Sequence, residues 1–542
     1  MRLPSALLCL SLWAASLPPL AGQPNVLTYH NDVARTGQNL AETTLTTSNV
    51  NSVTFGKIFQ ATLDGLVDAQ PLYVAGVSFP NLRIHNVLIV ATENDSLYAL
   101  DADTGVQLWQ VALLASGETA SDDRGCGQVT PQIGITSTPA IQLTPGTPGG
   151  AIFAVAMSKD GSGTYHQRLY KVSLTTGQPL IPAVDIAAQY PGTGQGSGGG
   201  YALFDPKQYK ERSGLLLLNG VLYLAWASHC DISPYTGWIM GYDAATLAQT
   251  SVIDVTPNGA EGAIWGAGGG LAADANGYIY FLDANGTFDT TLNSQGFPIN
   301  GDFGNAFIKL SAAANQLTVS DYFTMHNTTD ESNGDEDLGS GGALVLPDMT
   351  DANGRVRHLA IGAGKDANIY LVDRDNMGKF SPADDSAIYQ ELDGALPGGI
   401  WSMPAYYQGS VYFGAVGGPI RAFQFSQAVL STAPVSATGT QFPYPGATPS
   451  ISANGMANGI LWAVENNSPA VLHAYAASNL AHELYNSNQA ANGRDQFGSG
   501  NKFITPTIAN GKVYVGTPNG VAAFGLLNSR RRTPIRRPVS AD

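Results

Sequence analysis

Apolar and polar residues alternate in short segments along most of this chain. Residues 96–110, SLYALDADTGVQLWQ, contain two alternating runs joined by a turn of the form Asp-x-x-Thr-Gly. Alternation sends successive side chains to opposite faces of a strand, and glycine allows the tight connection, so this pattern predicts an antiparallel hairpin. Similar hairpins are expected at 168–180, 238–250 and 473–485.

A second recurring unit lies upstream of each hairpin. It consists of an apolar strand, a short turn with Gly or Asn, and a strand rich in Tyr, Val and Ala. The clearest copies are 215–227, LLLLNGVLYLAWA, and 504–516, ITPTIANGKVYVG, and others are 271–282 and 404–414. The two units together supply four antiparallel strands in about 45–60 residues, and a repeat of this size is typical of a β-propeller.

Counting the innermost strands gives eight repeats. The last repeat ends at residue 527 one strand short, and 53–62 can supply the missing strand, which removes a free sheet edge. The prediction is an all-β, eight-bladed β-propeller closed by an N-terminal strand, forming a single domain over 53–527. Seven blades with one irregular insertion, and two stacked sandwiches, are the alternatives. The eight repeats are expected to begin near Ala69, Ser137, Ser213, Gly268, Gly341, Ser402, Ser450 and Ile504.

The two ends of the chain differ from the repeats. Residues 1–22 contain one Arg, an apolar run and a small-residue end, which is typical of a secretory signal peptide. A membrane anchor is the alternative, but the apolar run is shorter than the roughly 20 residues that span a bilayer, and prolines interrupt it. Residues 23–52 are predicted to be an N-terminal extension and 528–542 a disordered Arg-rich tail. The protein is therefore expected to be secreted or periplasmic, with no transmembrane segment.

The composition agrees with one large ring of packed sheets. Of the 542 residues only 13% are charged, against roughly 25% in an average soluble domain. The 63 glycines fit a chain with many tight turns. The apolar content of 44% excludes a disordered protein, and the net charge of −16 argues against nucleic-acid binding, which depends on neutralising phosphates. The length alone suggests about three or four domains, but the regular repeats indicate one large domain instead.

The hairpin motif Ala-x-Asp-x-x-Thr-Gly-x-x-x-Trp at 99–109 resembles the repeat of the quinoprotein alcohol dehydrogenase-like superfamily. The resemblance extends over most of residues 50–527 and implies a PQQ-like β-propeller. Some members carry pyrroloquinoline quinone (PQQ) beside a calcium ion, with a Trp beneath the ring and an Asp as base, whereas others are scaffolds without a quinone. The adjacent-cysteine pair and the haem domain of some relatives are missing here. The cofactors implied are therefore PQQ and Ca²⁺, without haem.

Two sets of loops share the face of a propeller where ligands usually bind. One set leads into the innermost strands, and the other joins the second and third strands of each blade. Carboxylates in these loops are candidates for catalysis: Asp337, Asp289 and Glu465. Aromatic and basic residues there are candidates for binding a flat, anionic cofactor: Trp265, Trp401, Lys210, Arg212, Lys365 and Lys502. Side chains with hard oxygen donors are candidates for a calcium site: Glu93, Asn94, Asp302 and Asn466.

Two cysteines remain once the predicted signal peptide is set aside. Cys126 precedes the innermost strand of the second repeat, and Cys230 follows the second strand of the third repeat. The two loops belong to one face and to adjacent blades, and an exported protein folds under oxidising conditions. A structural disulfide between Cys126 and Cys230 is therefore predicted.

Three kinds of function agree with these features. The resemblance implies an exported quinoprotein-type oxidoreductase that acts on alcohols or sugars. A non-catalytic propeller that binds a carbohydrate or a protein is the first alternative. A polysaccharide-active enzyme that uses two carboxylates on the rim is the second. The expected partner is a small-molecule or carbohydrate ligand on the loop face of a monomer, and no nucleic acid.

Overall fold

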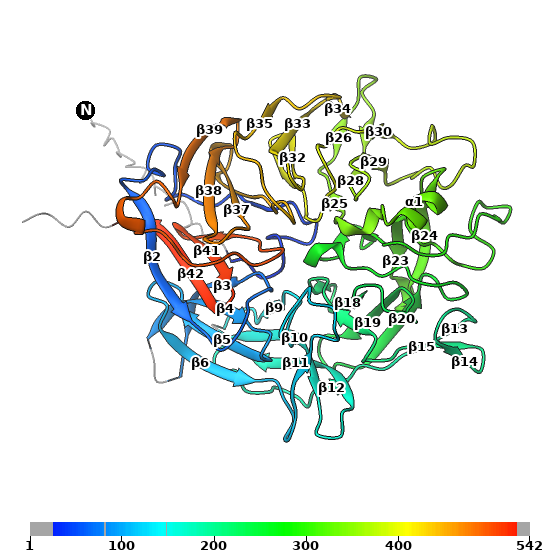
Figure 1. The fold of residues 1–542 in the computed structure, drawn as a ribbon, viewed down its shortest axis with the longest axis horizontal. Coiled ribbons are helices and arrows are strands. Elements are labelled where there is room, and N and C mark those ends of the chain that lie inside the picture. The colour runs from blue at the N-terminus through cyan, green and yellow to red at the C-terminus, as the bar shows by residue number, and fades with distance from the viewer. Residues whose placement is uncertain (1–24, 81–82, 148, 528–542) are drawn as a thin grey trace, which may run out of the picture.

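The computed structural model describes residues 25–80, 83–147 and 149–527 (Figure 1). Within these ranges it contains 42 strands and one α-helix, α1 (Thr328–Gly334). The predicted signal peptide (1–22) and Arg-rich tail (528–542) lie outside the described residues. No helix in the described part is long and apolar enough to cross a membrane.

Eight sheets contain four or more strands, and they follow one another in chain order. The first four sheets are β3 (Leu72–Ser78), β4 (Ile84–Ala91), β5 (Ser96–Asp101) and β6 (Gln107–Ala112); β9 (Ala140–Leu143), β10 (Gly150–Lys159), β11 (Tyr165–Ser173) and β12 (Val184–Asp185), with β7 (Thr119–Asp122) and β8 (Gln132–Ile133); β17 (Leu216–Leu218), β18 (Val221–Ser228), β19 (Trp238–Asp243) and β20 (Gln249–Asp254), with β16 (Tyr209–Glu211); and β21 (Ala272–Ala273), β22 (Ile279–Leu282), β23 (Phe307–Ser311) and β24 (Thr318–Phe323).

The remaining four large sheets continue this order. They are β25 (Leu344–Val345), β28 (Leu359–Gly362), β29 (Ile369–Asp373) and β30 (Gln390–Leu392); β31 (Ala405–Tyr407), β32 (Ser410–Gly414), β33 (Ile420–Ser426) and β34 (Val429–Leu430), with β35 (Ser436–Ala437); β36 (Ser450–Asn454), β37 (Ala457–Glu465), β38 (Val471–Ala476) and β39 (Asn479–Asn486), with β1 (Gln38–Asn39); and β40 (Thr507–Ala509), β41 (Lys512–Thr517), β42 (Gly520–Leu526) and β2 (Phe55–Thr62). Two small sheets lie outside these eight: β13 (Gln189–Pro191), β14 (Ser197–Gly198) and β15 (Tyr201–Leu203), and β26 (Met349–Thr350) with β27 (Val356–Arg357).

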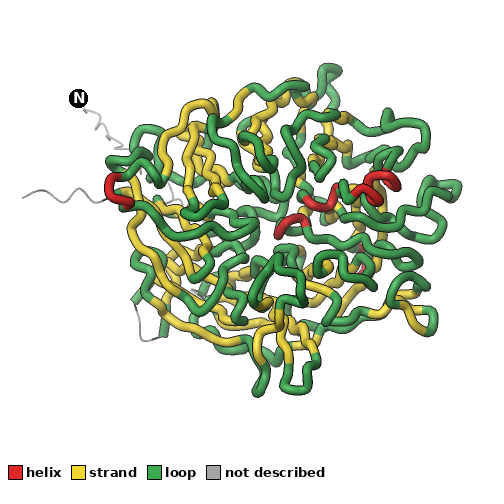
Figure 2. The backbone as a smooth tube through the Cα atoms, in the orientation of Figure 1, coloured by secondary structure: helices red, strands yellow, loops and turns green. Residues whose placement is uncertain are grey.

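The eight sheets are arranged around a common centre, and the chain colour runs once around it (Figure 1). Their innermost strands begin close to the predicted positions, for example β3 at Leu72 against Ala69 and β21 at Ala272 against Gly268. Figure 2 shows that loops occupy the middle of this view while strands lie further out. The all-β prediction is confirmed, and the repeat boundaries agree with it.

The N-terminal strand β2 pairs with the last strand of the chain, β42. The two strands are antiparallel, with Phe55 opposite Leu526 and Thr62 opposite Gly520. The pairing predicted for 53–62 is therefore present. It gives the eighth sheet a fourth strand and covers an edge that would otherwise expose unpaired backbone groups.

The Trp that ends the repeat motif, Trp109, packs between the first and second sheets. Its ring is buried, and its Nε1 donates a hydrogen bond to the carbonyl oxygen of Leu174, 3.0 Å away. A Cβ at Gly177, where φ is +67°, would lie 2.7 Å from the Trp109 ring, so glycine allows this close approach. The motif thus specifies packing between sheets.

Residues 26–42, called the belt below, contact all eight large sheets. Backbone groups of innermost strands that face the centre have no neighbouring strand, and the belt provides hydrogen-bond partners for them. The predicted N-terminal extension is therefore an integral part of the fold. In sheet order, the contacts are Val26 with Tyr73, Leu27 with Ile141, Thr28 with Leu215, Val33 with Ala273, Ala34 with Val345, Thr36 with Tyr406, Gly37 with Ile451, and Asn39 with Ile508.

Arg35 holds the belt in its path. Its side chain is 0% exposed. The guanidinium donates to the carbonyl oxygens of Leu271 at 2.9 Å, Tyr29 at 2.7 Å and Leu215 at 3.3 Å, and to Thr28 Oγ1 at 2.8 Å. One buried cation therefore ties the belt to two of the sheets.

Several buried carboxyl groups have raised pKa values, and we therefore predict that the fold is more stable at mildly acidic pH than at alkaline pH. Burial raises the pKa of Asp254 to about 7, of Glu391 to about 7 and of Glu331 to about 8. Above about pH 4 these carboxyl groups lose their protons in the unfolded chain but keep them in the folded protein. Their contribution to the free energy of unfolding is therefore fully present below about pH 4 and is lost as pH rises through about 7 to 8.

We expect the Tm at pH 5 to exceed the Tm at pH 8 in thermal melts at constant ionic strength. Asp254→Asn should flatten this dependence, because the amide keeps the shape of the carboxyl group and does not ionise. An equal or higher Tm at pH 8 would contradict the expectation.

Candidate functional site

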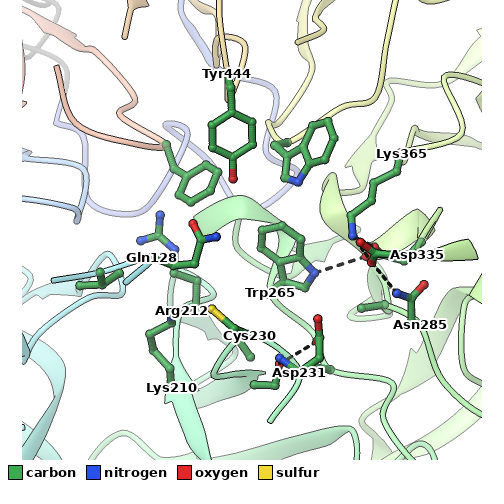
Figure 3. Close-up of a pocket in the computed structure, with 18 residues that line it drawn as sticks. Gln128, Lys210, Arg212, Cys230, Asp231, Trp265, Asn285, Asp335, Lys365 and Tyr444 are labelled. Carbon is green, nitrogen blue, oxygen red and sulfur yellow. Dashed lines mark hydrogen bonds and ion pairs between the residues drawn. The ribbon is translucent and has the colours of Figure 1, made fainter. Parts of the chain in front are cut away.

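A cavity of about 300 Å³ lies where the loops of several sheets converge (Figure 3). Four aromatic rings line it together with three basic side chains and several oxygen-bearing side chains. The rings are those of Trp265, Trp401, Tyr444 and Phe503, the basic residues are Lys210, Arg212 and Lys365, and the oxygen donors are Asp231, Asn285, Asp335 and Asp337.

Lys210 and Arg212 reach the cavity from one extended segment. Lys210 lies in β16, and Arg212 follows that strand directly, just before the innermost strand of the third sheet. Residues two apart in an extended segment point to the same side, so both side chains face the cavity while Glu211 points away. The loop that leads into the third sheet therefore delivers two cations to one wall.

These two cations are buried and have no direct ion-pair partner among the described residues. Lys210 is 5% exposed and Arg212 is 3% exposed, yet no hydrogen bond or ion pair joins either side chain to another described residue. The guanidinium of Arg212 packs over the ring of Phe503, 4.8 Å from its centre. Burial and the charge of Arg212 lower the pKa of Lys210 to about 8. A buried cation without a partner is costly, so this wall is built for an anion.

The opposite wall carries an ion pair around Asp337. The Lys365 ammonium lies 2.6 Å from Asp337 Oδ1 and also contacts Asp335 Oδ1. Trp265 Nε1 donates to Asp337 Oδ2 over 3.4 Å. Asp337 is 1% exposed, and burial raises its pKa to about 6 while Lys365 limits the rise. At neutral pH the group is therefore a carboxylate that can accept a proton.

Asn285 places a free amide oxygen at the same wall. Its Nδ2 donates to Asp335 Oδ1 at 2.8 Å, while its Oδ1 is buried without a hydrogen-bond partner among the residues that the structure describes. A buried amide oxygen without a partner costs free energy, so this atom too is suited to a ligand or a cation. Figure 3 shows Asn285, Asp335 and Lys365 gathered at one side of Trp265.

The structure brings most of the predicted cofactor-binding residues to this cavity. Lys210, Arg212, Lys365, Trp265 and Trp401 line it, and so does Asp337, one of the three predicted catalytic carboxylates. Lys502 lies at the rim, where its Nζ donates to Gln128 Oε1 at 2.9 Å.

Sequence reasoning missed several cavity residues. Asn285 lies in the long loop after β22, a length that marks a functional loop, and Asp231 directly follows Cys230. The positions of their loops could be predicted from the sequence, but no local motif distinguished these two side chains from ordinary turn residues. Tyr444 and Phe503 had no signal.

Other predicted site residues lie outside the cavity. Asp289 accepts hydrogen bonds from backbone groups of its own loop, and Glu465 lies 3.2 Å from His473. Among the predicted metal ligands, Glu93 accepts from Gly134 N, Asn94 donates to Asp64, Asp302 accepts from Asn258 N, and Asn466 donates to the Tyr444 carbonyl oxygen. Glu93 and Asn94 are neighbours in the chain, but no hydrogen bond joins the side chains of the four residues, so the structure does not gather them into one metal site. Within the described ranges, no three His, Cys, Asp or Glu side chains are placed to hold one metal ion.

The predicted disulfide between Cys126 and Cys230 is present. The two Cα atoms are 5.5 Å apart, and the bond joins the loop between β7 and β8 to the loop between β18 and β19. Cys230 lines the cavity next to Asp231. The disulfide therefore connects two loops at the cavity.

We expect the Cys126→Ser/Cys230→Ser double variant to lose about 2–4 kcal/mol of unfolding free energy, because the bond closes a long loop in the unfolded chain. Urea unfolding of the variant and of the wild type, with and without reductant, measures this loss. Reductant should change only the wild type. Equal stability of the variant and the oxidised wild type would refute the expectation.

Comparisons with solved structures identify the fold. The quinohemoprotein alcohol dehydrogenase from Comamonas testosteroni matches with a TM-score of 0.61 at 14% identity, over 96% of this chain and 83% of that one. The quinohemoprotein alcohol dehydrogenase ADHIIG from Pseudomonas putida HK5 matches with a TM-score of 0.60 at 14% identity, over 95% and 82%. A europium-containing methanol dehydrogenase matches with a TM-score of 0.58 at 11% identity, over 93% and 98%.

No family profile matches this chain, and no curated protein matches it in sequence. The structural likeness therefore rests on the arrangement of the sheets. It shows that the chain has the fold of the quinoprotein dehydrogenases, as the repeat motif indicated.

Proposed function

We propose that the eight sheets are the blades of one propeller closed by β2, and that the protein is a quinoprotein-type oxidoreductase acting on alcohols or sugars. The observation that carries this proposal is the cavity, where two unpaired buried cations face a carboxylate–lysine pair across aromatic rings. The likeness to alcohol and methanol dehydrogenases supports the same reaction class.

The residues present fit a flat, anionic quinone such as PQQ. Trp265 and Trp401 offer ring faces, and Arg212 and Lys210 would neutralise carboxylates. The Nη2 group of Arg212 has no hydrogen-bond partner among the described residues, so it could donate to a carboxylate of the quinone. When bound, the quinone would supply the two-electron acceptor that protein side chains lack. The sequence contains no Cys-x-x-Cys-His motif, so covalently attached haem is not part of the proposal.

A hard cation such as Ca²⁺ fits the other wall in part. Asp231 and Asn285 are the oxygen donors that would hold it, and Asn285 Oδ1 is free to do so. Calcium takes six to eight oxygens, more than these side chains provide. Ion binding should therefore depend on further oxygens from the anionic ligand.

Asp337 is the proposed proton acceptor in the reaction. It would take the proton of the substrate hydroxyl on its carboxylate, and the Lys365 ammonium would hold that carboxylate in place. The Trp265 N–H fixes its second oxygen. Burial excludes water from the group and keeps its pKa near the working range of a base.

Binding and turnover of the purified protein test the proposal. With PQQ and Ca²⁺ added, we expect a quinone absorbance that stays with the protein on gel filtration, and dye reduction with alcohols or sugars. The Lys210→Met/Arg212→Met variant should lose quinone binding at least about tenfold, since a charge-assisted hydrogen bond is worth about 1.5–3 kcal/mol. Lys171→Met in β11, away from the cavity, is a control for the loss of a positive charge. Absence of bound quinone would reject the proposal.

Export and a monomeric state are also proposed, in line with the sequence. Detection of the protein outside the cytoplasm and a monomer mass in light scattering would support them. The polysaccharide-cleaving alternative has less support, because Asp289 and Glu465 have separate partners outside the cavity.

A further inference from the structure

Lys210 is a buried amine that lines the cavity. The other two lysines near the cavity are engaged: Lys365 pairs with two aspartates, and Lys502 donates to Gln128. Lys210 makes no hydrogen bond and no ion pair with any residue in the described ranges, although it lines the cavity. Its Nζ is therefore available to a ligand.

The surroundings of Lys210 favour a reactive amine over a permanent cation. Burial and then the positive charge of Arg212 on the same segment disfavour the ammonium form of Lys210, and these outweigh Glu93 and Asp68, which favour it. Desolvation beside a second cation is the arrangement that activates nucleophilic lysines, because it makes the neutral amine easier to form. The titratable groups around Lys210 include Arg212, Glu93, Asp68, Lys502 and His229.

Arg212 supplies an anchor beside this amine. Its guanidinium is buried, has an unpartnered Nη2 and rests on the Phe503 ring. A guanidinium in this state binds a carboxylate well, because the pairing satisfies both the charge and the free N–H group. The two side chains point into one cavity from positions two residues apart, so a carboxylate held by Arg212 lies next to the Lys210 amine.

We propose that Lys210 is a nucleophile that forms an imine with a 2-oxo acid, whose carboxylate is bound by Arg212. The ammonium loses a proton, its nitrogen attacks the carbonyl carbon, and a C=N double bond replaces the C=O double bond as the oxygen leaves in water. Overall, the ammonium and the 2-oxo acid give a protonated imine and one water. The step needs no oxidant and no quinone, so it goes beyond the proposed oxidoreductase function and does not depend on it.

The test uses the whole purified protein, glyoxylate and borohydride. Borohydride delivers hydride to the imine carbon and converts a transient imine into a stable secondary amine, which mass spectrometry of peptides locates. We expect the adduct on Lys210 to exceed that on Lys365 at least about tenfold in the wild type, although both lysines line the same cavity. This comparison within one molecule requires no variant.

Variants distinguish binding of the substrate carboxylate by Arg212 from simple exposure of the Lys210 amine. Lys210→Arg should abolish the adduct at this site, and Arg212→Met should reduce it about tenfold or more with glyoxylate but little with benzaldehyde, which lacks a carboxylate. Circular dichroism confirms that each variant is folded. Equal labelling of Lys210 and Lys365, or labelling unaffected by Arg212→Met, would overturn the inference. An adduct on Lys210 without quinone binding would support the imine proposal and reject the oxidoreductase proposal. Quinone-dependent turnover without an adduct would reject the imine proposal and support the oxidoreductase proposal.

Discussion

The Asp337→Asn variant will lose turnover with alcohols by about two to four orders of magnitude, the usual contribution of a positioned general base. The amide cannot accept the hydroxyl proton, while its size leaves the cavity intact. In the wild type, turnover should fall as pH drops through about 6, because the raised pKa of the Asp337 carboxyl means that the group becomes protonated there. Steady-state kinetics with saturating PQQ and Ca²⁺ measure both effects.

Asp335→Asn is the matched control for this variant. Asp335 contacts the same Lys365 ammonium, but its side chain is 69% exposed, and a solvated carboxylate contributes less. We expect its turnover to stay within about tenfold of the wild type. If Asp337→Asn keeps wild-type turnover while quinone binding is unchanged, Asp337 is not the proton acceptor.

Replacing Arg35 by Met will destabilise the fold by about 3–5 kcal/mol, the range observed when one partner of a buried charged network is removed. Methionine fills much of the space but donates no hydrogen bond. The carbonyl oxygens of Leu271, Tyr29 and Leu215 would then lose a buried donor, and each unsatisfied group costs free energy. Urea unfolding monitored by tryptophan fluorescence measures the loss.

Arg355→Met provides the comparison for the Arg35 variant. Arg355 is exposed, and its side chain makes no hydrogen bond with the described residues, so the change should stay within about 0.5 kcal/mol. A similar small effect at Arg35 would mean that the belt contributes little to the stability of the fold. A large effect at Arg35 alone would support its role in holding the belt.

The candidate site was predictable in part because some of its residues carry a local signal. Lys210 and Arg212 precede an apolar innermost strand, and Asp337 and Trp265 occupy the equivalent loops of other repeats. Their positions within the repeats therefore predicted that they lie on the face formed by the loops. The same reasoning placed Asp289 and Glu465 there, but their loops contact other partners. Position in the repeat identifies the face of the molecule and leaves open which side chains turn inward.

The oxygen donors and the belt had weaker signals. Asn285 and Asp231 are polar residues in turns, where solvated Asn and Asp are common. Their approach to one cavity depends on how several loops pack together. The belt has no alternating pattern, because its backbone pairs with strands of six different sheets instead of one neighbour, and two of its side chains reach the other two sheets.

By itself, the sequence determined most of the strands, their repetition, the pairing of β2 with β42 and the position of the two cysteines in neighbouring repeats. These features follow from side-chain alternation and turn chemistry, which act between residues close in the chain. Only the tertiary structure decided that Lys210 and Arg212 are buried without a direct ion-pair partner among the described residues, that Lys365 pairs with Asp337, and that residues 26–42 contact every large sheet. These contacts join residues far apart in the chain, and the burial and charge that give the site its chemistry arise only when the sheets assemble around one centre.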